Sequence, residues 1–178
     1  MPYPILITAF AFLLLCCATD LRTRRIPNVI TLSAMVGGIA LNGLYFGFTG
    51  LGFSVAGLLI AFLLLLTPFA LGGVGGGDVK MMAAVGALLG PRLGLAGLAI
   101  GVILGGVMAV VHLAGRGRLR EKLHATWSMF FVAAVTRSVS PLKVSANEPG
   151  AVALPYSVPL ALGTISVLIA AVVMRGGH

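Results

Sequence analysis

Acidic side chains are scarce in this chain: its 178 residues include four Asp or Glu residues against twelve Lys or Arg residues. Charged residues of both signs make up 9% of the sequence, whereas hydrophobic residues make up 59%. Mean hydropathy is +1.11, and several apolar runs are long enough to span a bilayer. This composition excludes an ordinary soluble fold. It predicts a multi-span membrane protein in contact with the lipid bilayer.

Cysteine and histidine, the usual ligands of structural metals, are also scarce. The two cysteines, Cys16 and Cys17, are adjacent inside the first apolar run, so they form neither a zinc site nor a disulfide framework. The three histidines, His112, His124 and His178, do not have the spacing of metal ligands. We therefore expect no metal site and no other cofactor.

The net charge of +8 raises the question of nucleic acid, but no basic stripe is interleaved with aromatic residues, so we expect no nucleic-acid partner. In a membrane protein such an excess is typical of cytoplasmic loops. Most basic residues fall in the segments 22–25, 80 and 116–122. Each pair of these segments is separated by an even number of crossings if the short segment 79–90 crosses. The positive-inside rule then places all of them in the cytoplasm and the N-terminus outside.

The apolar runs predict an all-α fold: a polytopic membrane helix bundle of about six transmembrane helices, formed as one domain over residues 1–178. The expected spans are 3–19, 28–46, 51–71, 79–90, 93–113 and 151–174. The fourth is too short to cross unaided, so we expect protein neighbours to make up its shortfall. Residues 125–135 are predicted to form an interfacial or re-entrant helix.

Glycine marks two further features of these spans. A short uncharged turn is expected at 47–50, between the second and third spans. Small residues recur at Gly97, Gly101 and Gly105, a spacing that lets a neighbouring helix pack closely. Glycines that face lipid in a tolerant helix fit that spacing equally well.

Asp20 and Asp78 are the acidic residues whose positions indicate chemistry. Each stands at the end of an apolar span, next to backbone breakers and cations, whereas Glu121 and Glu148 lie in polar segments. Because the second and third spans separate the two aspartates, both must emerge on the same membrane face at similar depth. An ionisable residue at membrane depth is a functional-site hypothesis by default.

Two carboxylates that share a site cannot both ionise cheaply, so the pair can hold a single proton. Such a pair activates water: one carboxylate takes a proton from the water while the other donates a proton to a peptide carbonyl. Neither a covalent nucleophile nor a metal is needed. The alternative is that Asp20 and Asp78 are unrelated interfacial residues, and that Asp78 caps the helix beginning at Val79.

The stretch Gly72–Lys80 is rich in glycine and lies between two apolar runs. It lacks the Gly-Lys-Ser/Thr ending of a P-loop, so nucleotide binding is not expected. Gly75 and Gly77 are predicted to let this loop bend Asp78 toward Asp20 and to give a substrate backbone room.

Two polar residues near the aspartates have open roles. Lys80 is expected either to bias the proton affinity of the pair or to snorkel to the membrane interface. Asn28 is expected either to orient Asp20 or to begin the second helix, because Pro27-Asn28 has the form of a helix start.

At this point the residues resemble a family. Residues 75–78, Gly-Gly-Gly-Asp, fit the Gly-x-Gly-Asp signature of intramembrane aspartic proteases, and the continuation to Gly90 resembles the type IV prepilin peptidase branch. Asp20, the basic linker after it and Ile26-Pro27-Asn28 are similar to that family's first catalytic aspartate region. Pro155-Tyr156 and residues 159–163 are similar to its C-terminal motif, although Ser157 stands where the family commonly has glycine.

The resemblance implies an intramembrane aspartic endopeptidase with Asp20 and Asp78 as its catalytic pair. Its substrates would be prepilins or pseudopilins, cleaved just after a glycine at the end of their basic leader. Cleavage would occur at the cytoplasmic face of the bacterial inner membrane. Pilus or secretion assembly machinery is a further expected partner.

The chain departs from the larger family members, which carry a cytoplasmic insertion with paired Cys-x-x-Cys motifs. Nothing comparable lies between Thr19 and Leu32. We therefore expect a peptidase-only form, like those serving tight-adherence or Flp-type pili, without N-methyltransferase activity. Two other classes stay open: a proton-coupled small transporter that uses the same Asp pair as a relay, and a non-catalytic membrane component of a secretion or pilus machine.

Overall fold

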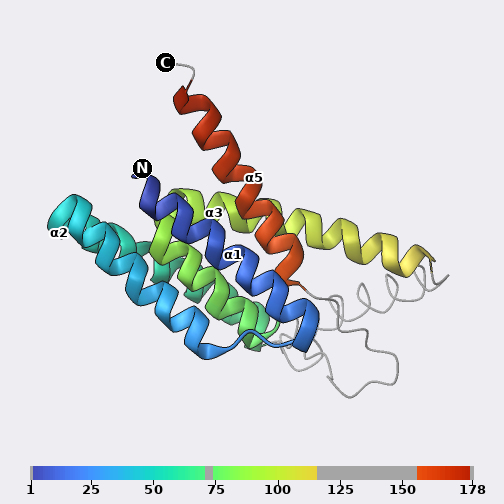
Figure 1. Ribbon diagram of the computed structural model, residues 1–178. Coiled ribbons are helices and arrows are strands. Elements are labelled where there is room, and N and C mark those ends of the chain that lie inside the picture. The colour runs from blue at the N-terminus through green and yellow to red at the C-terminus, as the bar shows by residue number, and fades with distance from the viewer. Residues whose placement is uncertain (1, 71–73, 116–155, 177–178) are drawn as a thin grey trace, which may run out of the picture.

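The computed structural model describes residues 2–70, 74–115 and 156–176, and every regular element in these ranges is an α-helix (Figure 1). The helices are α1 (Tyr3–Thr23), α2 (Asn28–Ala70), α3 (Gly76–Gly115) and α5 (Ser157–Gly176). Each is long and apolar enough to cross a membrane. The all-α helix bundle is confirmed, while the count of about six spans stays a prediction. The segments 116–124, 125–135 and 138–150, for which loops and an interfacial helix are predicted, lie outside the described residues.

The outward faces of these helices are apolar. Phe48 is 91% exposed and Leu44 is 82% exposed, and large exposed side chains of this kind occur along all of the helices. In the apolar window of α1, α2 and α3, only 28% of the residues are buried inside the protein. Lipid contact accounts for such a surface, because a soluble monomer rarely exposes large contiguous apolar patches.

α2 is two helices joined at Gly47, where the backbone takes a left-handed conformation with φ +63°. The chain reverses direction there, and the second half of α2 returns beside the first (Figure 1). Gly50 lets the halves approach closely, because a Cβ at this position would overlap the backbone of Asn42. The predicted turn at 47–50 is therefore present, although the helix resumes sooner than expected. Both ends of α2 consequently lie at the same end of the bundle.

α3 is broken in the same way at Gly90, whose φ is +75°. The Phe53 ring of α2 covers this glycine so closely that a Cβ would overlap it, so a larger residue fits neither the space nor the backbone conformation. Pro91 follows, and it has no N–H to donate back to the carbonyl of Ala87. The first half of α3 therefore ends inside the protein, and the backbone carbonyls at its end need hydrogen-bond donors from elsewhere.

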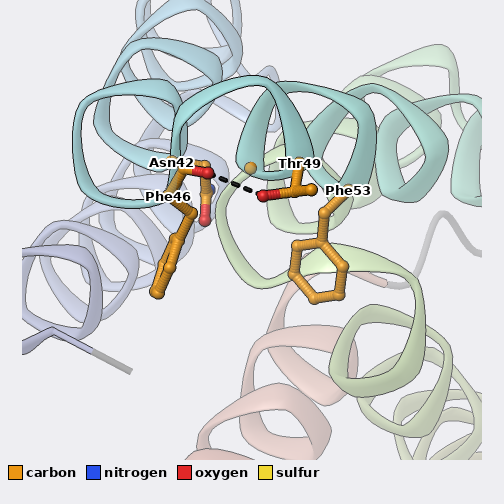
Figure 2. A pocket seen from close by; sticks show the side chains of 5 residues that line it. Asn42, Phe46, Thr49 and Phe53 are labelled. Atoms are coloured by element: carbon orange, nitrogen blue, oxygen red, sulfur yellow. Dashed lines mark hydrogen bonds between the residues drawn. The ribbon is translucent and has the colours of Figure 1, made fainter.

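Side chains of α2 supply those donors. Asn42 Nδ2 donates to the carbonyls of Ala87 and Leu88, at 3.1 Å each, and Ser54 Oγ donates to Ala87 at 2.5 Å. Asn42 and Ser54 are fully buried, at 1% and 0% exposure. Asn42 lines a pocket of about 300 Å³ together with Phe46 and Phe53. Figure 2 shows Asn42 close to Phe46 in this pocket. The break in α3 is thus capped from α2.

The first half of α3 is the core of the bundle. Every residue from Met81 to Gly90 is buried. A helix that is apolar all round needs such surroundings, and α2 provides much of them. This confirms the prediction that neighbouring helices make up for the shortness of segment 79–90.

The second half of α3 packs against α5 through its glycines. A Cβ on Gly97 would lie 2.7 Å from Thr164 Oγ1, and a Cβ on Gly101 would lie 2.7 Å from the Cα of Leu160. Gly163 of α5 fits against the backbone of Gly101 in return. These glycines therefore face a helix, and the lipid-facing interpretation is wrong for them. Their packing fixes where α5 begins relative to the other helices.

Candidate active site

Asp20 lies in the last turn of α1, because this helix continues past the predicted end at residue 19 to Thr23. The helix ends where Arg24 takes a left-handed conformation, with φ 51°, and donates its N–H to the Asp20 carbonyl at 2.8 Å. This is a common way to end a helix, although glycine usually occupies the left-handed position. The Asp20 side chain is 9% exposed, so its carboxylate is largely removed from solvent.

Asp78 lies in the first turn of α3 and is half-buried. Its backbone N–H donates to the Gly75 carbonyl at 3.1 Å, and its carboxylate faces the backbone N–H of Gly75. That second contact is typical of a helix start, so Asp78 contributes to capping its own helix. Capping does not exclude a second role, because a carboxylate has several acceptor positions.

The two predicted glycines differ in what they contact. A Cβ on Gly75 would lie 3.2 Å from Asp78 Oδ2, whereas a Cβ on Gly77 would lie 3.5 Å from Ile26, an ordinary contact distance. Gly77 is in the first turn of α3. Among the described residues, positive φ at glycine occurs only at positions 47 and 90. Gly75 therefore matters for the space it leaves beside Asp78, not for a left-handed backbone.

One cavity of about 600 Å³ brings all of the sequence-predicted site residues together. They are Asp20, Asn28, Gly75, Gly77, Asp78 and Lys80. The end of α1 and the starts of α2 and α3 meet around it. This is the convergence that two crossings between the aspartates predict. Thr23 also lines the cavity, and Arg24 and Arg25 give it a basic margin.

Lys80 and Asn28 contact each other. Lys80 Nζ donates to Asn28 Oδ1 at 2.9 Å, and both side chains are exposed at the cavity wall. Asn28 is also the first residue of α2, as the helix-start interpretation expects. The contact ties the start of α2 to the first turn of α3. It holds the Lys80 ammonium at the cavity wall.

Ser157 is the residue that sequence reasoning missed. Its Oγ donates a hydrogen bond of 2.5 Å to Asp20 Oδ2, and its side chain is fully buried. Ser157 is also the first residue of α5. The only signal in the sequence was its place after Pro155-Tyr156, where it stands in a position that is commonly glycine in the family.

Within the part of the chain that the structure describes, no group of three or more His, Cys, Asp or Glu side chains is arranged to hold a metal ion. The cavity instead offers two carboxylates, a basic margin and a buried hydroxyl. Such a site can hold a proton and a water between two acidic groups.

An apolar helix bundle with two carboxylates at one cavity defines a polytopic membrane protein with an acidic site. The chain belongs to the Type IV leader peptidase family, which it matches over residues 7–110. That region contains both Asp20 and Asp78, while α5 lies beyond it. The family resemblance found in the sequence is thereby confirmed.

A curated relative extends this result. The chain is 31% identical over 117 residues to the prepilin leader peptidase/N-methyltransferase of Bacillus subtilis (strain 168). The matched region covers 64% of this chain and 46% of that protein, so the chain corresponds to less than half of its relative. No solved structure matches the chain.

Proposed function

We propose that this protein is an intramembrane aspartic endopeptidase that removes the basic leader of prepilin or pseudopilin substrates. The observation that carries the proposal is the joint lining of one cavity by Asp20 and Asp78 in a chain of the Type IV leader peptidase family. The relative from Bacillus subtilis is named for prepilin leader peptidase activity, which supports the same substrate class.

The chemistry follows from the two carboxyl groups. One, ionised, takes a proton from a water whose oxygen attacks the scissile carbonyl carbon, while the other donates its proton to the carbonyl oxygen. A tetrahedral diol results. The diol collapses when its carbon–nitrogen bond breaks. The leaving amine then takes a proton from the carboxyl group that had accepted one from the water. One of the two hydroxyl protons of the diol returns to the other carboxylate and the second stays on the new carboxyl group, so the pair ends with the single proton that it began with.

The surroundings fit a substrate that stays in the membrane. The cavity opens at one end of the bundle, among residues that the positive-inside rule places in the cytoplasm. We propose that the substrate's apolar segment lies among the spans at the inner membrane, and that its leader stays cytoplasmic. N-methyltransferase activity is not part of the proposal, because residues 19–32 lack the Cys-x-x-Cys insertion of bifunctional family members.

The test is coexpression with a candidate prepilin, scored by a gel shift. Asp20→Asn and Asp78→Asn should each reduce processing by at least about 100-fold, because general acid–base groups contribute on this scale. Both variants should still insert in the membrane. Glu121→Gln is the matched control, since it neutralises a carboxylate that is not part of the proposed pair, and it should process normally.

Two results would overturn the proposal. Normal processing by both Asp→Asn variants would leave the chain as a non-catalytic component of a secretion or pilus machine. Proton-coupled flux in proteoliposomes, together with no cleavage of any prepilin, would instead make it a small transporter that uses the same aspartates as a relay.

A further inference from the structure

The geometry points to a third residue of the reaction: we propose that Ser157 is a positioning residue that holds Asp20 as the base of the pair and leaves Asp78 as the acid. This inference rests on the proposed peptidase function and deepens it. It assigns different tasks to two carboxylates that the sequence treats alike.

The contact is specific to one oxygen. Ser157 Oγ donates to Asp20 Oδ2 at 2.5 Å. Because Oδ2 is engaged, Oδ1 is the oxygen left to accept a proton from the attacking water. The bond holds the Asp20 carboxylate as an acceptor in a fixed orientation, so it takes the role of base and leaves the proton-donating role to Asp78. The carboxyl group of Asp78 is then the one that can protonate the scissile carbonyl.

Helix ends act on both carboxylates, since Asp78 lies at the positive end of α3. Asp20 stands in the last turn of α1, where the negative end of the helix dipole disfavours a carboxylate. The first residue of α5 touches its carboxylate, so the positive end of that helix lies against it. The hydroxyl and the start of α5 together offset the unfavourable position in α1. Without them Asp20 would be a poorly placed anion at the end of its own helix.

The position of Ser157 is held by its neighbours. Its side chain is 0% exposed, and its carbonyl accepts a long contact from Cys17 Sγ at 4.0 Å. Gly97 and Gly101 fix the register of α5 against α3, as described above. The hydroxyl therefore reaches Asp20 from a preorganised helix, which is the condition for precise alignment of a catalytic group.

Basic side chains line the cavity as a whole. Lys80, Arg24 and Arg25 line the cavity that both aspartates share. Residues 157–174 of α5 contain no ionisable side chain. The Ser157 hydroxyl is thus the side-chain group by which α5 bonds one aspartate of the pair.

The experiment compares Ser157→Ala and Ser157→Thr in the full-length protein, reconstituted with a purified prepilin. Ser157→Ala should lower kcat by about 10- to 100-fold, the effect of losing a hydrogen bond to a charged group. KM should stay within about twofold, because the hydroxyl contacts Asp20 and not the substrate. Ser157→Thr keeps the hydroxyl and should recover most of the loss.

Thr164→Val is the matched control. Thr164 is another fully buried hydroxyl residue of α5, but its Oγ1 bonds the Leu160 carbonyl within the same helix at 2.9 Å. Thermal unfolding of Ser157→Ala and Thr164→Val should be similar, while kcat should fall only in Ser157→Ala. If Ser157→Thr does not fold because its extra methyl group has no room, the comparison of Ser157→Ala with Thr164→Val still tests the role of the Ser157 hydroxyl.

The remaining outcomes contradict either the role of Ser157 or the proposed peptidase function. An unchanged kcat in Ser157→Ala, a rise in KM alone, or a loss of activity that merely follows unfolding would each overturn the role of Ser157. In all three cases inactive Asp20→Asn and Asp78→Asn variants would leave the peptidase function standing. Active Asp→Asn variants would instead remove the proposed function itself.

Discussion

Gly57 of α2 and Gly86 of α3 bring their backbones into direct contact. A Cβ on either glycine would overlap the carbonyl group of the other. Gly86 lies in the fully buried part of α3, so this contact joins the core helix to the returning half of α2. Small residues at such crossings let helices pack closely in a membrane, where no hydrophobic effect drives them together.

The space beside Asp78 predicts different outcomes for two neighbouring glycines. Gly75→Ala should lower kcat by about tenfold or more, because its Cβ would press on Asp78 Oδ2 from 3.2 Å, and misplacing a reacting group is costly. Gly77→Ala is the matched control and should retain most activity, since its Cβ would meet Ile26 at an ordinary 3.5 Å. Equal losses in both variants would mean that backbone freedom, and not space, matters here.

The packing of α5 predicts a remote effect on the site. Gly101→Ala would place a Cβ 2.7 Å from the Leu160 Cα, so α5 must shift. We expect Ser157 to lose its alignment with Asp20 and kcat to fall by about tenfold. Gly106→Ala on the same helix has nothing within 4 Å of its Cβ and should behave like the wild type. A wild-type kcat in Gly101→Ala would show that the register of α5 is unimportant.

The capped break in α3 predicts a loss of stability without a loss of chemistry. Asn42→Leu removes a donor to Ala87 and Leu88, which should cost about 1–3 kcal/mol because the buried Leu88 carbonyl loses its side-chain donor and Ala87 keeps only that of Ser54. The melting temperature in detergent should fall by several degrees. The activity of the folded fraction should persist, since Asn42 is about 21 Å along α2 from the cavity residue Asn28.

Ser33→Ala serves as the reference for that measurement. Ser33 is exposed, and its hydroxyl bonds the Val29 carbonyl within its own helix. Its removal should leave the melting temperature nearly unchanged. If Asn42→Leu melts like Ser33→Ala, the carbonyls at the break have found other donors and the capping account is wrong.

The Lys80–Asn28 contact predicts coupling between two exposed residues. Lys80→Met and Asn28→Ala should each reduce kcat/KM modestly, by less than about tenfold, because exposed contacts of this kind are weak. The double variant should be no worse than the more damaged single variant, since both changes remove one interaction. Multiplicative losses would mean that the two residues act separately on the site.

Counting crossings was enough to bring Asp20 and Asp78 to the same end of the bundle. That inference holds because it depends only on the two spans between them, and these are the two halves of α2. Apolar composition likewise predicts the buried segment Met81–Gly90, because a short run that cannot reach across lipid alone must be covered by protein. Both predictions concern whether a segment lies in lipid, in water or inside the protein, and hydrophobicity governs that placement.

Sequence patterns could not locate the contacts made at helix ends. α1 continues through Asp20 because nothing before Arg24 breaks it, and polar residues end an apolar run without ending a helix. α5 begins at Ser157, later than the apolar run beginning at residue 151 indicates. The hydrogen bond from Ser157 to Asp20 joins positions 137 residues apart, and no local pattern encodes it. The choice between a neighbouring helix and lipid for Gly97 and Gly101 needed the structure for the same reason.

The bond between Ser157 and Asp20 also bears on how the protein matures. Asp20, Asp78 and the helices that carry them are synthesised well before α5 reaches the ribosomal exit. During that interval the acidic pair has no hydroxyl to set one member apart from the other. The packing of α5 would then be a late step in completing the site, because the two carboxylates become inequivalent only when a helix made after both of them has reached Asp20.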